Sequence, residues 1–501
     1  MITLSEILLL LPEILLILTS FIILIVDLFS YKKFNYAVLA SGGIFISIIF
    51  VIMIYIGLIN VPADSSLSFK GILSIDKYSL FFKVLILSST LAISLSNIST
   101  FDKDIKSKGE FWSLFLLSLT GMTILSSTTE MITTWVALEL TSLPLVGMLA
   151  LSEKKYSLEI ALKYLVLSAT SSAVILMGIA YLYGITGSTF FNEINSVSEI
   201  INGKIFSSQY NILLIFASIL IISGVSFKIA SFPFMSWVPD VYQGAPTFIT
   251  MYLSVVSKIA GFSILIRILF QALNGSSYEG WSMFVAIMSL VSMIVGNIMA
   301  LRQRNIKRLF AYSTIAHAGY ILIGIASIQS SGSLENSITG IQATIFYLVG
   351  YAITNLTAFI SILYISDKIN SNLIDDFKGV GFKFKSQSII LAISLISLLG
   401  IPLTIGFMGK AFIFSAAITN GFFWLSMAGI INSLISAYYY IKVIKVMFVD
   451  ISSDYEIATK TDNIYALAVT YVGVIMIFVI GIAPAFLLNF LENVVNTLLA
   501  N

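Results

Sequence analysis

Five titratable side chains lie deep inside apolar stretches of the sequence, where they could carry protons. They are Glu139, Lys228, Lys258, His317 and Lys410. A charge at the centre of a bilayer costs about 2.5–3.5 kcal/mol even on the gentlest scale, so such residues pair with one another or mark an ion route. A set of titratable groups at one depth suits lateral proton transfer, whereas a sugar or drug site needs one concentrated pocket. We therefore treat the five as candidate proton-transfer residues.

Glu139 and Lys228 are the first two of these candidates. Glu139 lies nine residues into its apolar stretch, which places it about 13 Å deep at about 1.5 Å per residue. Lys228 stands five residues before Pro233, where a helix break would open backbone carbonyls and admit water. Burial and a nearby carboxylate act on a lysine in opposite directions, so a Glu139–Lys228 pair could trade its proton on small movements. The alternative for Glu139 is a structural hydrogen bond between helices.

The other three candidates are also placed at membrane depth. Lys258 is eleven residues into its stretch, too deep to reach the interface easily, and Lys410 follows Pro402 by eight residues. For the lysines, the alternative is a static charge pair that holds helices in register. His317 is the only histidine. A single imidazole is a poor metal site but suits a proton relay, and its alternative is a satisfied packing residue.

The remaining charged residues within or beside apolar stretches have simpler interpretations. Glu13, one turn into the first stretch, is either structural or a coupling contact. Lys83, Lys163 and Arg267 lie nearer helix ends, where long side chains reach the interface, and we interpret them as anchors. Asp240 falls in a turn-rich segment between two prolines, and we expect a cap or turn residue.

Composition explains why these charges matter. The 501 residues are 58% hydrophobic and 10% charged, with a mean hydropathy of +1.00, which a water-facing surface cannot accommodate. The chain is therefore expected to be an integral membrane protein. With no cysteine and one histidine, we expect no iron–sulfur cluster, haem or metal in this chain. A net charge of +2 offers no basic face for nucleic acid.

The helices that must position the candidate residues follow from the apolar runs, each bounded by polar residues, glycine or proline. We predict an all-α polytopic membrane protein with about fourteen transmembrane helices. The first run begins with Glu6 and is read as a retained helix rather than a signal peptide. The fourteen runs are 5–28, 35–59, 77–98, 111–128, 130–152, 158–184, 211–244, 247–272, 281–301, 306–328, 337–365, 386–420, 422–448 and 464–490.

Two runs, the seventh and the twelfth, are too long for one straight crossing and contain Pro233 and Pro402. Both are predicted to be broken helices. Because five crossings separate them, the units around them must cross the membrane in opposite senses, which predicts two inverted five-helix repeats. Local similarity is limited to Phe-Met pairs and a lysine near each break. The predicted parts are N-terminal helices 1–3 (1–110), repeat one (111–272), repeat two (281–448) and a C-terminal helix (464–501).

Orientation follows from the lysines and arginines of alternate loops. One set of loops holds eighteen and the opposite set three, namely Lys70, Lys77 and Lys204. This excess predicts that the first set is cytoplasmic, or in the matrix, and that both termini lie on the far side. The abundance of Ile, Lys, Asn and Ser indicates an AT-rich genome. We expect a multi-pass protein of a bacterial inner membrane with periplasmic termini; a mitochondrially encoded chain is the alternative.

Several segments carry a resemblance to a known family. They are 10–15 (LLPEIL), 135–140 (WVALEL), 227–228, 236–247 (SWVPDVYQGAPT) and Lys258. Essentially end to end, the chain resembles the subunit N family of the proton-pumping NADH:quinone oxidoreductase, respiratory complex I, equivalent to mitochondrial subunit 2. Segment 227–247 is specific for the wider antiporter-like family, whereas the Pro12-Glu13 opening and the lysine of helix 12 favour subunit N.

The resemblance implies inverted repeats, one proton route per subunit and a hetero-oligomer with other membrane-arm subunits in the lipid bilayer. FMN, iron–sulfur clusters, NADH and quinone would belong to other subunits of the parent complex. By motif match, Glu139 takes the place of the family's helix 5 glutamate and Lys228 that of its paired lysine. Lys258 matches the connecting lysine and Lys410 the terminal lysine. His317, like Glu13, is matched by helix position alone.

The function implied is that of a translocase subunit with no redox chemistry of its own. Quinone reduction elsewhere would rearrange the Glu139–Lys228 pair, and the displaced proton would pass by way of Lys258 towards Lys410. The nearest alternative is a subunit of a multi-chain Na⁺/H⁺ antiporter or a membrane-bound hydrogenase. A structural membrane scaffold, whose buried charges only hold helices together, is an alternative from another class. A solitary metabolite transporter fits less well.

Overall fold

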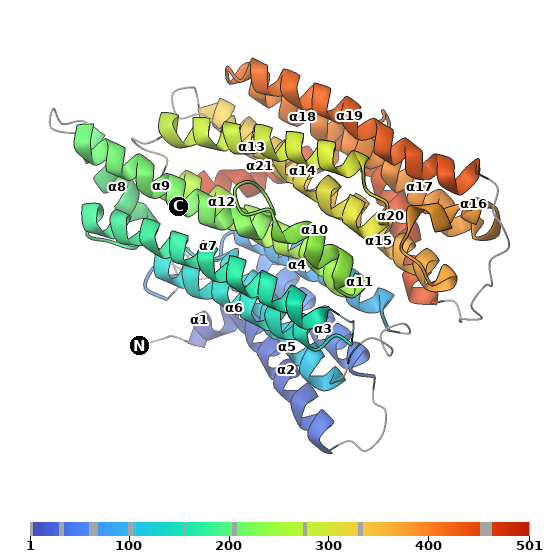
Figure 1. Ribbon diagram of the computed structural model, residues 1–501. Helices are drawn as coiled ribbons and strands as arrows, with labels where there is room; N and C mark the ends of the chain where they lie inside the picture. Colours follow the sequence, from blue (N-terminus) through green and yellow to red (C-terminus); the bar gives the residue numbers. More distant parts are fainter. Residues whose placement is uncertain are drawn as a thin grey trace.

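The computed structural model is a bundle of packed helices (Figure 1). It describes residues 4–29, 35–59, 69–98, 105, 107–153, 156–202, 208–273, 278–328, 334–450 and 463–499. Within these residues nearly every segment is helical, and the only extended pairing is four isolated bridges. The predicted all-α class is confirmed.

Twelve of the described spans are long and apolar enough to cross a membrane, so the chain is a multi-pass membrane protein. They are α2 (Leu11–Phe29), α3 (Tyr36–Ile56), α4 (Lys77–Ser96), α6 (Met131–Ala150), α7 (Ser157–Thr186), α9 (Ser208–Ile229), the span made by α11 (Thr247–Ser254), α12 (Val256–Arg267) and η3 (Ile268–Ala272), α13 (Tyr278–Leu301), α14 (Ile306–Ala326), α15 (Leu334–Ile369), α19 (Phe423–Phe448) and α20 (Ile464–Ile482).

Further apolar helices complete the predicted set. They are α5 (Lys108–Leu125) and the consecutive pair α17 (Lys385–Leu399) and α18 (Ile405–Thr419). Each of the fourteen predicted runs therefore falls on one helix or on two or three consecutive helices. The short elements are α1 (Leu4–Leu9), α8 (Phe191–Asn202), α10 (Trp237–Gly244), η4 (Ile374–Phe377), α16 (Val380–Lys383) and α21 (Pro484–Leu499).

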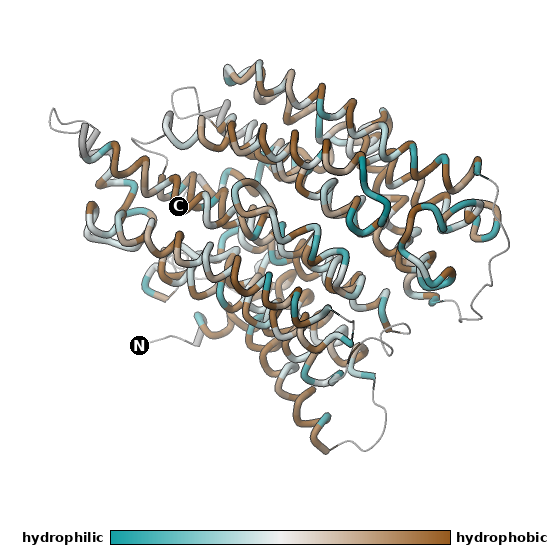
Figure 2. Tube along the Cα trace, in the orientation of Figure 1, coloured by the Kyte–Doolittle hydropathy of each residue, from teal (hydrophilic) through white to brown (hydrophobic). Residues whose placement is uncertain are grey.

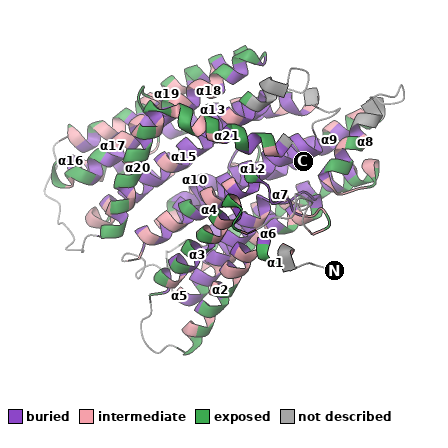
Figure 3. Ribbon diagram, turned by 180° about the vertical axis from the view of Figure 1, so that it is seen from behind, coloured by how far each residue is buried: buried purple, intermediate pink, exposed green. Residues whose placement is uncertain are grey.

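The burial pattern separates a central core from a lipid-facing shell. The most apolar stretches of the α11–α12 span and of α14 are fully buried, whereas only 28% of that of α2 and 22% of that of α20 is buried (Figure 3). Apolar colour runs along the helices, and hydrophilic colour lies mainly at their ends and connections (Figure 2). Exposed leucine, isoleucine and phenylalanine side chains on the shell suit contact with lipid tails.

The two predicted broken helices are confirmed. The seventh run ends as α9 at Ile229 and resumes as α10 at Trp237, and the twelfth ends as α17 at Leu399 and resumes as α18 at Ile405. Proline cannot donate the backbone hydrogen bond that would continue a helix. In both breaks the residue directly after the first helix, Ala230 or Gly400, adopts a positive φ.

Matched local features support the two inverted repeats. Glu130 caps the N-terminus of α6 and bridges to Phe190, while Asn305 caps α14 and bridges to Leu373. A glycine allows close helix contact at equivalent points: Gly121 of α5 against α6 and Gly296 of α13 against α14. The spacing in the sequence from Glu130 to Asn305 equals the spacing from Gly121 to Gly296. The residue bounds given above for the repeats remain a prediction.

Three boundaries differ from the prediction. The predicted C-terminal run, 464–490, is divided into two helices: α20 ends at Ile482, and α21 begins at Pro484. Proline suits the first helical position but interrupts a preceding helix. Helix α8 lies in a connection for which no helix was expected. The eighth span breaks at Val255, where the carbonyl of Ser254 accepts a hydrogen bond from the Tyr351 hydroxyl at 3.0 Å.

Candidate functional site

Lys228 and Glu139 line one small cavity between α6, α7 and α9. Its volume is about 20 Å³, roughly the space that one water molecule needs. The ammonium of Lys228 donates to the hydroxyl of Ser142 at 3.2 Å. Within the described residues, Ser142 is the hydrogen-bond partner of the Lys228 ammonium, and Lys228 forms no ion pair with Glu139. The predicted direct pair is therefore absent, although the two charges share a cavity.

Lys258 is fully buried on α12, three residues after the Val255 break. Its ammonium donates to the backbone carbonyl of Thr314 on α14 and lies 5.3 Å from the ring centre of Tyr351. A ring face attracts a cation, and a carbonyl accepts a hydrogen bond from it. The break and α14 together give Lys258 a polar pocket without a carboxylate.

His317 uses both ring nitrogens. Nδ1 lies 2.7 Å from the hydroxyl of Tyr347, and Nε2 lies 3.0 Å from the hydroxyl of Tyr440. The Tyr440 hydroxyl also lies 2.5 Å from Oγ of Ser313. A neutral imidazole donates at one nitrogen and accepts at the other, so this arrangement can receive a proton on one side and release one on the other.

Lys410 sits where the twelfth helix breaks. Its ammonium donates to the carbonyl of Leu399, the last residue of α17, at 2.9 Å and to the hydroxyl of Ser433 at 2.8 Å. It also lies 4.8 Å from the ring centre of Tyr320. The break therefore supplies the acceptor that holds the lysine, as expected for irregular backbone at membrane depth. Lys228 precedes its break and Lys410 follows its own, so the two lysines are not equivalent positions of the repeats.

Buried tyrosine and asparagine side chains connect Lys258 to Lys410. From Thr314, which also contacts the Tyr351 hydroxyl at 3.2 Å, the path follows α14 to His317 and crosses to Tyr440. Neighbouring Tyr439 donates to Asn297 at 3.0 Å, and Asn297 donates to the Tyr320 hydroxyl beneath Lys410 at 3.2 Å. Sequence reasoning predicted the charged ends of this network and missed its tyrosines.

A signal for these tyrosines was present in the sequence. Tyrosine is typical of membrane interfaces, where its hydroxyl meets water. Tyr347 and Tyr351 are one helical turn apart within a long apolar run, and Tyr439 and Tyr440 are adjacent in another. Tyrosines this far from a helix end need hydrogen-bond partners inside the protein, and they could have been singled out for that reason.

The region between Lys228 and Lys258 contains buried polar atoms that could form further hydrogen bonds. Among the described residues, the hydroxyls of Tyr164 and Tyr242 and Nε1 of Trp237 are buried without a hydrogen-bond partner. Leaving such groups unpaired is costly. This part of the interior can therefore gain hydrogen bonds when its side chains rearrange.

Two predicted anchors are wrong. Lys83 is buried on α4, and its ammonium lies 2.8 Å from Oε1 of Glu13, so Glu13 belongs to a buried ion pair. Arg267 is also buried, and it donates to both carboxylate oxygens of Asp76 at 2.9 and 3.1 Å. Both side chains lie on the inward faces of their helices, where pairing is possible and the interface is out of reach.

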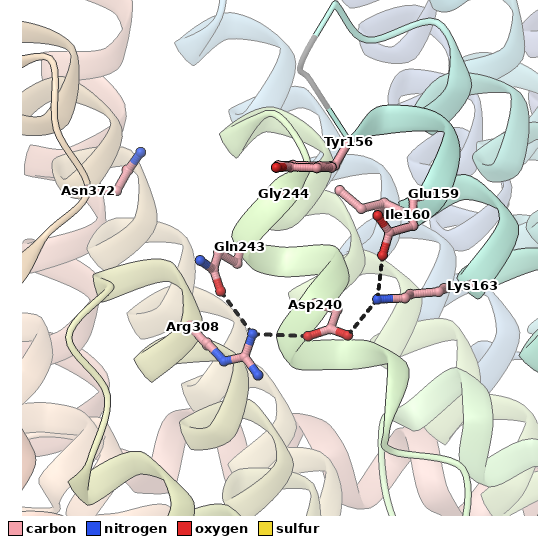
Figure 4. Close-up of a pocket in the computed structure, with 9 residues that line it drawn as sticks. All are labelled: Tyr156, Glu159, Ile160, Lys163, Asp240, Gln243, Gly244, Arg308 and Asn372. Atoms are coloured by element: carbon pink, nitrogen blue, oxygen red, sulfur yellow. Dashed lines mark hydrogen bonds and ion pairs between the residues drawn. The ribbon is translucent and has the colours of Figure 1, made fainter.

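Asp240 is not a turn residue. It lies in the first turn of α10, where its carboxylate contacts Lys163 of α7 at 3.2 Å and Arg308 of α14 at 3.0 Å. Lys163 is half-exposed near a helix end, as an anchor would be. These residues line a surface cavity of about 540 Å³ between the three helices (Figure 4).

The comparison with known families decides the classification. The profile of the family described as NADH:quinone oxidoreductase/Mrp antiporter, TM, matches residues 128–436. The chain belongs to this family. The matched segment includes all five candidate proton-transfer residues, from Glu139 to Lys410.

Curated relatives of this NADH:quinone oxidoreductase/Mrp antiporter chain match it over nearly its whole length. NADH-quinone oxidoreductase subunit N of Dehalococcoides mccartyi is 34% identical, over 97% of this chain and 98% of that protein. NADH-quinone oxidoreductase subunit N 2 of Chloroherpeton thalassium is 35% identical, over 94% of this chain and 90% of that protein.

Solved structures support the same family. A chain of respiratory complex I from Thermus thermophilus matches with a TM-score of 0.77 and 26% identity, over 96% of this chain and 100% of that chain. A chain of the archaeal membrane-bound sulfane sulfur reductase has a TM-score of 0.86 at 24% identity, over 98% of each chain. A chain of the Mrp complex from Dietzia sp. has a TM-score of 0.79 at 17% identity, over 98% of this chain and 97% of that chain. The last two show a shared fold only.

Proposed function

We propose that protons cross the membrane through this chain by way of Glu139, Lys228, Lys258, His317 and Lys410. The chain is a membrane subunit of a proton-translocating NADH-quinone oxidoreductase, complex I, which follows from its family and its relatives. It works in a hetero-oligomer with other membrane-arm subunits. The assignment of individual residues to the proton route is our proposal.

The buried polar groups between Lys258 and Lys410 are the observation that carries this proposal. They form three hydrogen-bonded segments, Thr314–Tyr351, Tyr347–His317–Tyr440 and Tyr439–Asn297–Tyr320. The rings of Tyr439 and Tyr440 pack together, and the Tyr320 ring lies under Lys410. Hydroxyl and imidazole groups both donate and accept, so small side-chain movements that join the segments would let a proton pass along them. A purely structural ion pair would need neither the histidine nor the tyrosines.

The ammonium groups of Lys228, Lys258 and Lys410 donate to neutral hydrogen-bond acceptors, so their protonation depends on their surroundings. Among the described residues, the partners are the Ser142 and Ser433 hydroxyls and the carbonyls of Thr314 and Leu399. In the part of the chain that the structure describes, no carboxylate contacts these ammonium groups directly, and Glu139 only shares the cavity of Lys228. A nearby change of charge or hydration therefore decides whether each holds its proton. Moving one charge against 100 mV costs about 2.3 kcal/mol, which modest changes around a buried lysine can supply.

The sequence of events begins outside the chain. Quinone reduction in neighbouring subunits shifts the Glu139 and Lys228 side chains within their shared cavity. The displaced proton passes the Tyr164 and Tyr242 region to Lys258. It then moves through His317 to Lys410 and leaves the protein.

The chain takes part in this reaction as a translocase and carries out no electron transfer. It lacks cysteine, and the ring nitrogens of its one histidine, His317, lie within hydrogen-bond distance of the hydroxyls of Tyr347 and Tyr440. FMN, the iron–sulfur clusters and the NADH and quinone sites would belong to other subunits. The loop charges and the bacterial relatives support a bacterial inner membrane with both termini in the periplasm.

The test is to replace Lys228 by alanine in the native complex and to measure NADH-driven quinone reduction together with proton pumping in membrane vesicles. We expect pumping to fall, and quinone reduction as well if coupling is tight. Full pumping by an assembled Lys228→Ala complex would contradict the assignment. Sodium-dependent transport without NADH oxidation would instead support the cation antiporter alternative.

A further inference from the structure

Asp240 joins both halves of the molecule. Its carboxylate contacts Lys163 on α7, in predicted repeat one, and Arg308 on α14, in predicted repeat two. Figure 4 shows the carboxylate between the two cations, with Gln243 beside Arg308 at 2.9 Å. We call the Lys163–Asp240–Arg308 contact the Asp240 bridge.

The helix that carries Asp240 is the second half of the broken helix that carries Lys228. Lys228 lies in the last turn of α9, and α10 begins after the break. Tyr164, Phe227 and Trp237 form an aromatic cluster with ring centres 5.1–5.2 Å apart. Tyr164 is next to Lys163 in the sequence, Phe227 is next to Lys228, and Trp237 lies on α10 with Asp240. Close packing of the three rings therefore connects the Lys228 site to the bridge.

α10 is bound to α14 more tightly than to α7. The ammonium of Lys307, a fully buried residue of α14, donates to the carbonyl of Ala245 at the end of α10 at 2.6 Å. Arg308 adds contacts to Asp240 and Gln243. The same α14 carries Thr314 and His317, which belong to the network from Lys258. α10 and α14 therefore form one unit, and Lys163 is its ion-pair contact with α7.

The ion pairs of the bridge are suited to opening and closing rather than to holding the fold. The side chains of Lys163, Asp240 and Arg308 are 44%, 39% and 32% exposed. Ion pairs this exposed contribute little to stability because water competes for both charges. The adjoining cavity of about 540 Å³ leaves room for the side chains to move.

We propose that Asp240 is a positioning residue that couples the Lys228 site to the Lys258–His317 network. While its carboxylate holds Lys163, α7 and the α10–α14 unit are aligned, and a rearrangement at Lys228 moves the acceptors of Lys258. Without the contact between Asp240 and Lys163, the two repeats rearrange independently, and proton transfer from the Lys228 site to Lys258 becomes inefficient. This inference rests on the proton route proposed above.

The test compares Asp240→Asn with Asp240→Glu in the assembled complex. We expect Asp240→Asn to lower the protons pumped per NADH oxidised by about fivefold or more, the lower end of measured couplings between sites. Asp240→Glu restores the charge and should recover most of the ratio. Glu159→Gln is the matched control, because Glu159 also pairs with Lys163, at 2.9 Å, but within α7.

The outcomes separate the two proposals. A native pumping ratio in Asp240→Asn, in membranes where Lys228→Ala lowers pumping, overturns the coupling role alone. Native pumping in Lys228→Ala overturns the proton route itself. If Asp240→Asn does not assemble, Lys163→Gln removes only the α7 arm of the bridge at a half-exposed residue, and an unchanged ratio there also overturns the inference.

A second measurement tests movement directly. The chain contains no cysteine, so the pair Ile160→Cys on α7 and Gly244→Cys on α10 would be the only cysteines in it. These two positions adjoin in the same cavity and leave the Asp240 bridge intact. Linking them with a short reducible cross-linker should stop pumping, and reduction should restore it. The control pair Tyr156→Cys and Ile160→Cys links residues of the α7 side alone, keeps the Asp240 bridge, and should leave pumping unchanged. Native pumping by the α7–α10 cross-linked complex would contradict the need for movement.

Discussion

Nε2 of His317 and the hydroxyl oxygen of Tyr440 lie 3.0 Å apart, across α14 and α19. The Tyr440 ring packs against that of Tyr439, with ring centres 4.5 Å apart, and Tyr439 begins the hydrogen-bonded branch through Asn297 to Tyr320, below Lys410. Replacing Tyr440 by phenylalanine removes only the hydroxyl. The hydroxyl contacts both His317 and Ser313, and each hydrogen bond is worth about 1 kcal/mol, so we expect proton pumping to be about fivefold slower or more.

The control for this change is Tyr438→Phe. Tyr438 is two residues away on the same helix but is 64% exposed on its outer face, whereas Tyr440 is fully buried. Pumping should be measured in vesicles with equal amounts of assembled complex. An equal effect of the two substitutions would mean that the Tyr440 hydroxyl has no part in transfer.

Lys258→Met keeps the length of the side chain and removes its proton. We expect proton pumping to fall roughly 100-fold or more, as when a positioned proton-transfer group is removed. Because the ammonium of Lys258 has a neutral carbonyl and a ring face as partners, the substitution leaves no carboxylate without its countercharge. Assembly should therefore persist, as checked by native electrophoresis. Normal pumping in Lys258→Met would favour the structural scaffold interpretation.

The Glu13–Lys83 pair should behave as a structural contact. Both side chains are buried, and the charges lie 2.8 Å apart. Removing one partner of a buried pair costs about 3–5 kcal/mol, because the other charge stays buried. Glu13→Gln and Lys83→Met should each lower the thermal unfolding temperature of the purified complex, and the double variant should recover part of the loss. Additive effects in this cycle would rule out a direct interaction.

Arg267 should fix the start of α4. It donates twice to Asp76, which caps that helix through the backbone N–H of Ser79. Hydrogen bonds to charged groups contribute about 1.5–3 kcal/mol each. Arg267→Met, which removes the guanidinium whose Nη2 contacts both Asp76 oxygens, should speed amide hydrogen exchange at residues 77–80. Lys77→Gln, at the exposed first position of the same helix, is the control, and equal exchange in the two variants would contradict this role.

The wrong anchors, Lys83 and Arg267, show a limit of reading charges from position along a run. Distance from a helix end indicates whether a long side chain can reach the interface. It does not indicate which face of the helix the side chain occupies. Lys83 and Arg267 face inward, where carboxylates from α2 and from the start of α4 meet them.

The break at Val255 and the tyrosine network illustrate the same limit. Proline marks the breaks at Pro233 and Pro402, since a missing N–H is a property of the residue itself. The Val255 break has no such mark, because it accompanies a hydrogen bond from Tyr351 on a distant helix. The acceptors of Lys228, Lys258 and Lys410 are likewise hydroxyls and carbonyls that sequence spacing does not reveal.

The sequence by itself determined the membrane class, the fourteen apolar runs, the two proline breaks and the residues that place charge at membrane depth. These features depend on the cost of polar groups in lipid, which is set locally by each stretch of chain. The tertiary structure decided which charges pair, which neutral groups hold the lysines and how His317 connects to Lys410. Those contacts depend on the rotation and packing of helices far apart in the chain, and only the folded bundle specifies them.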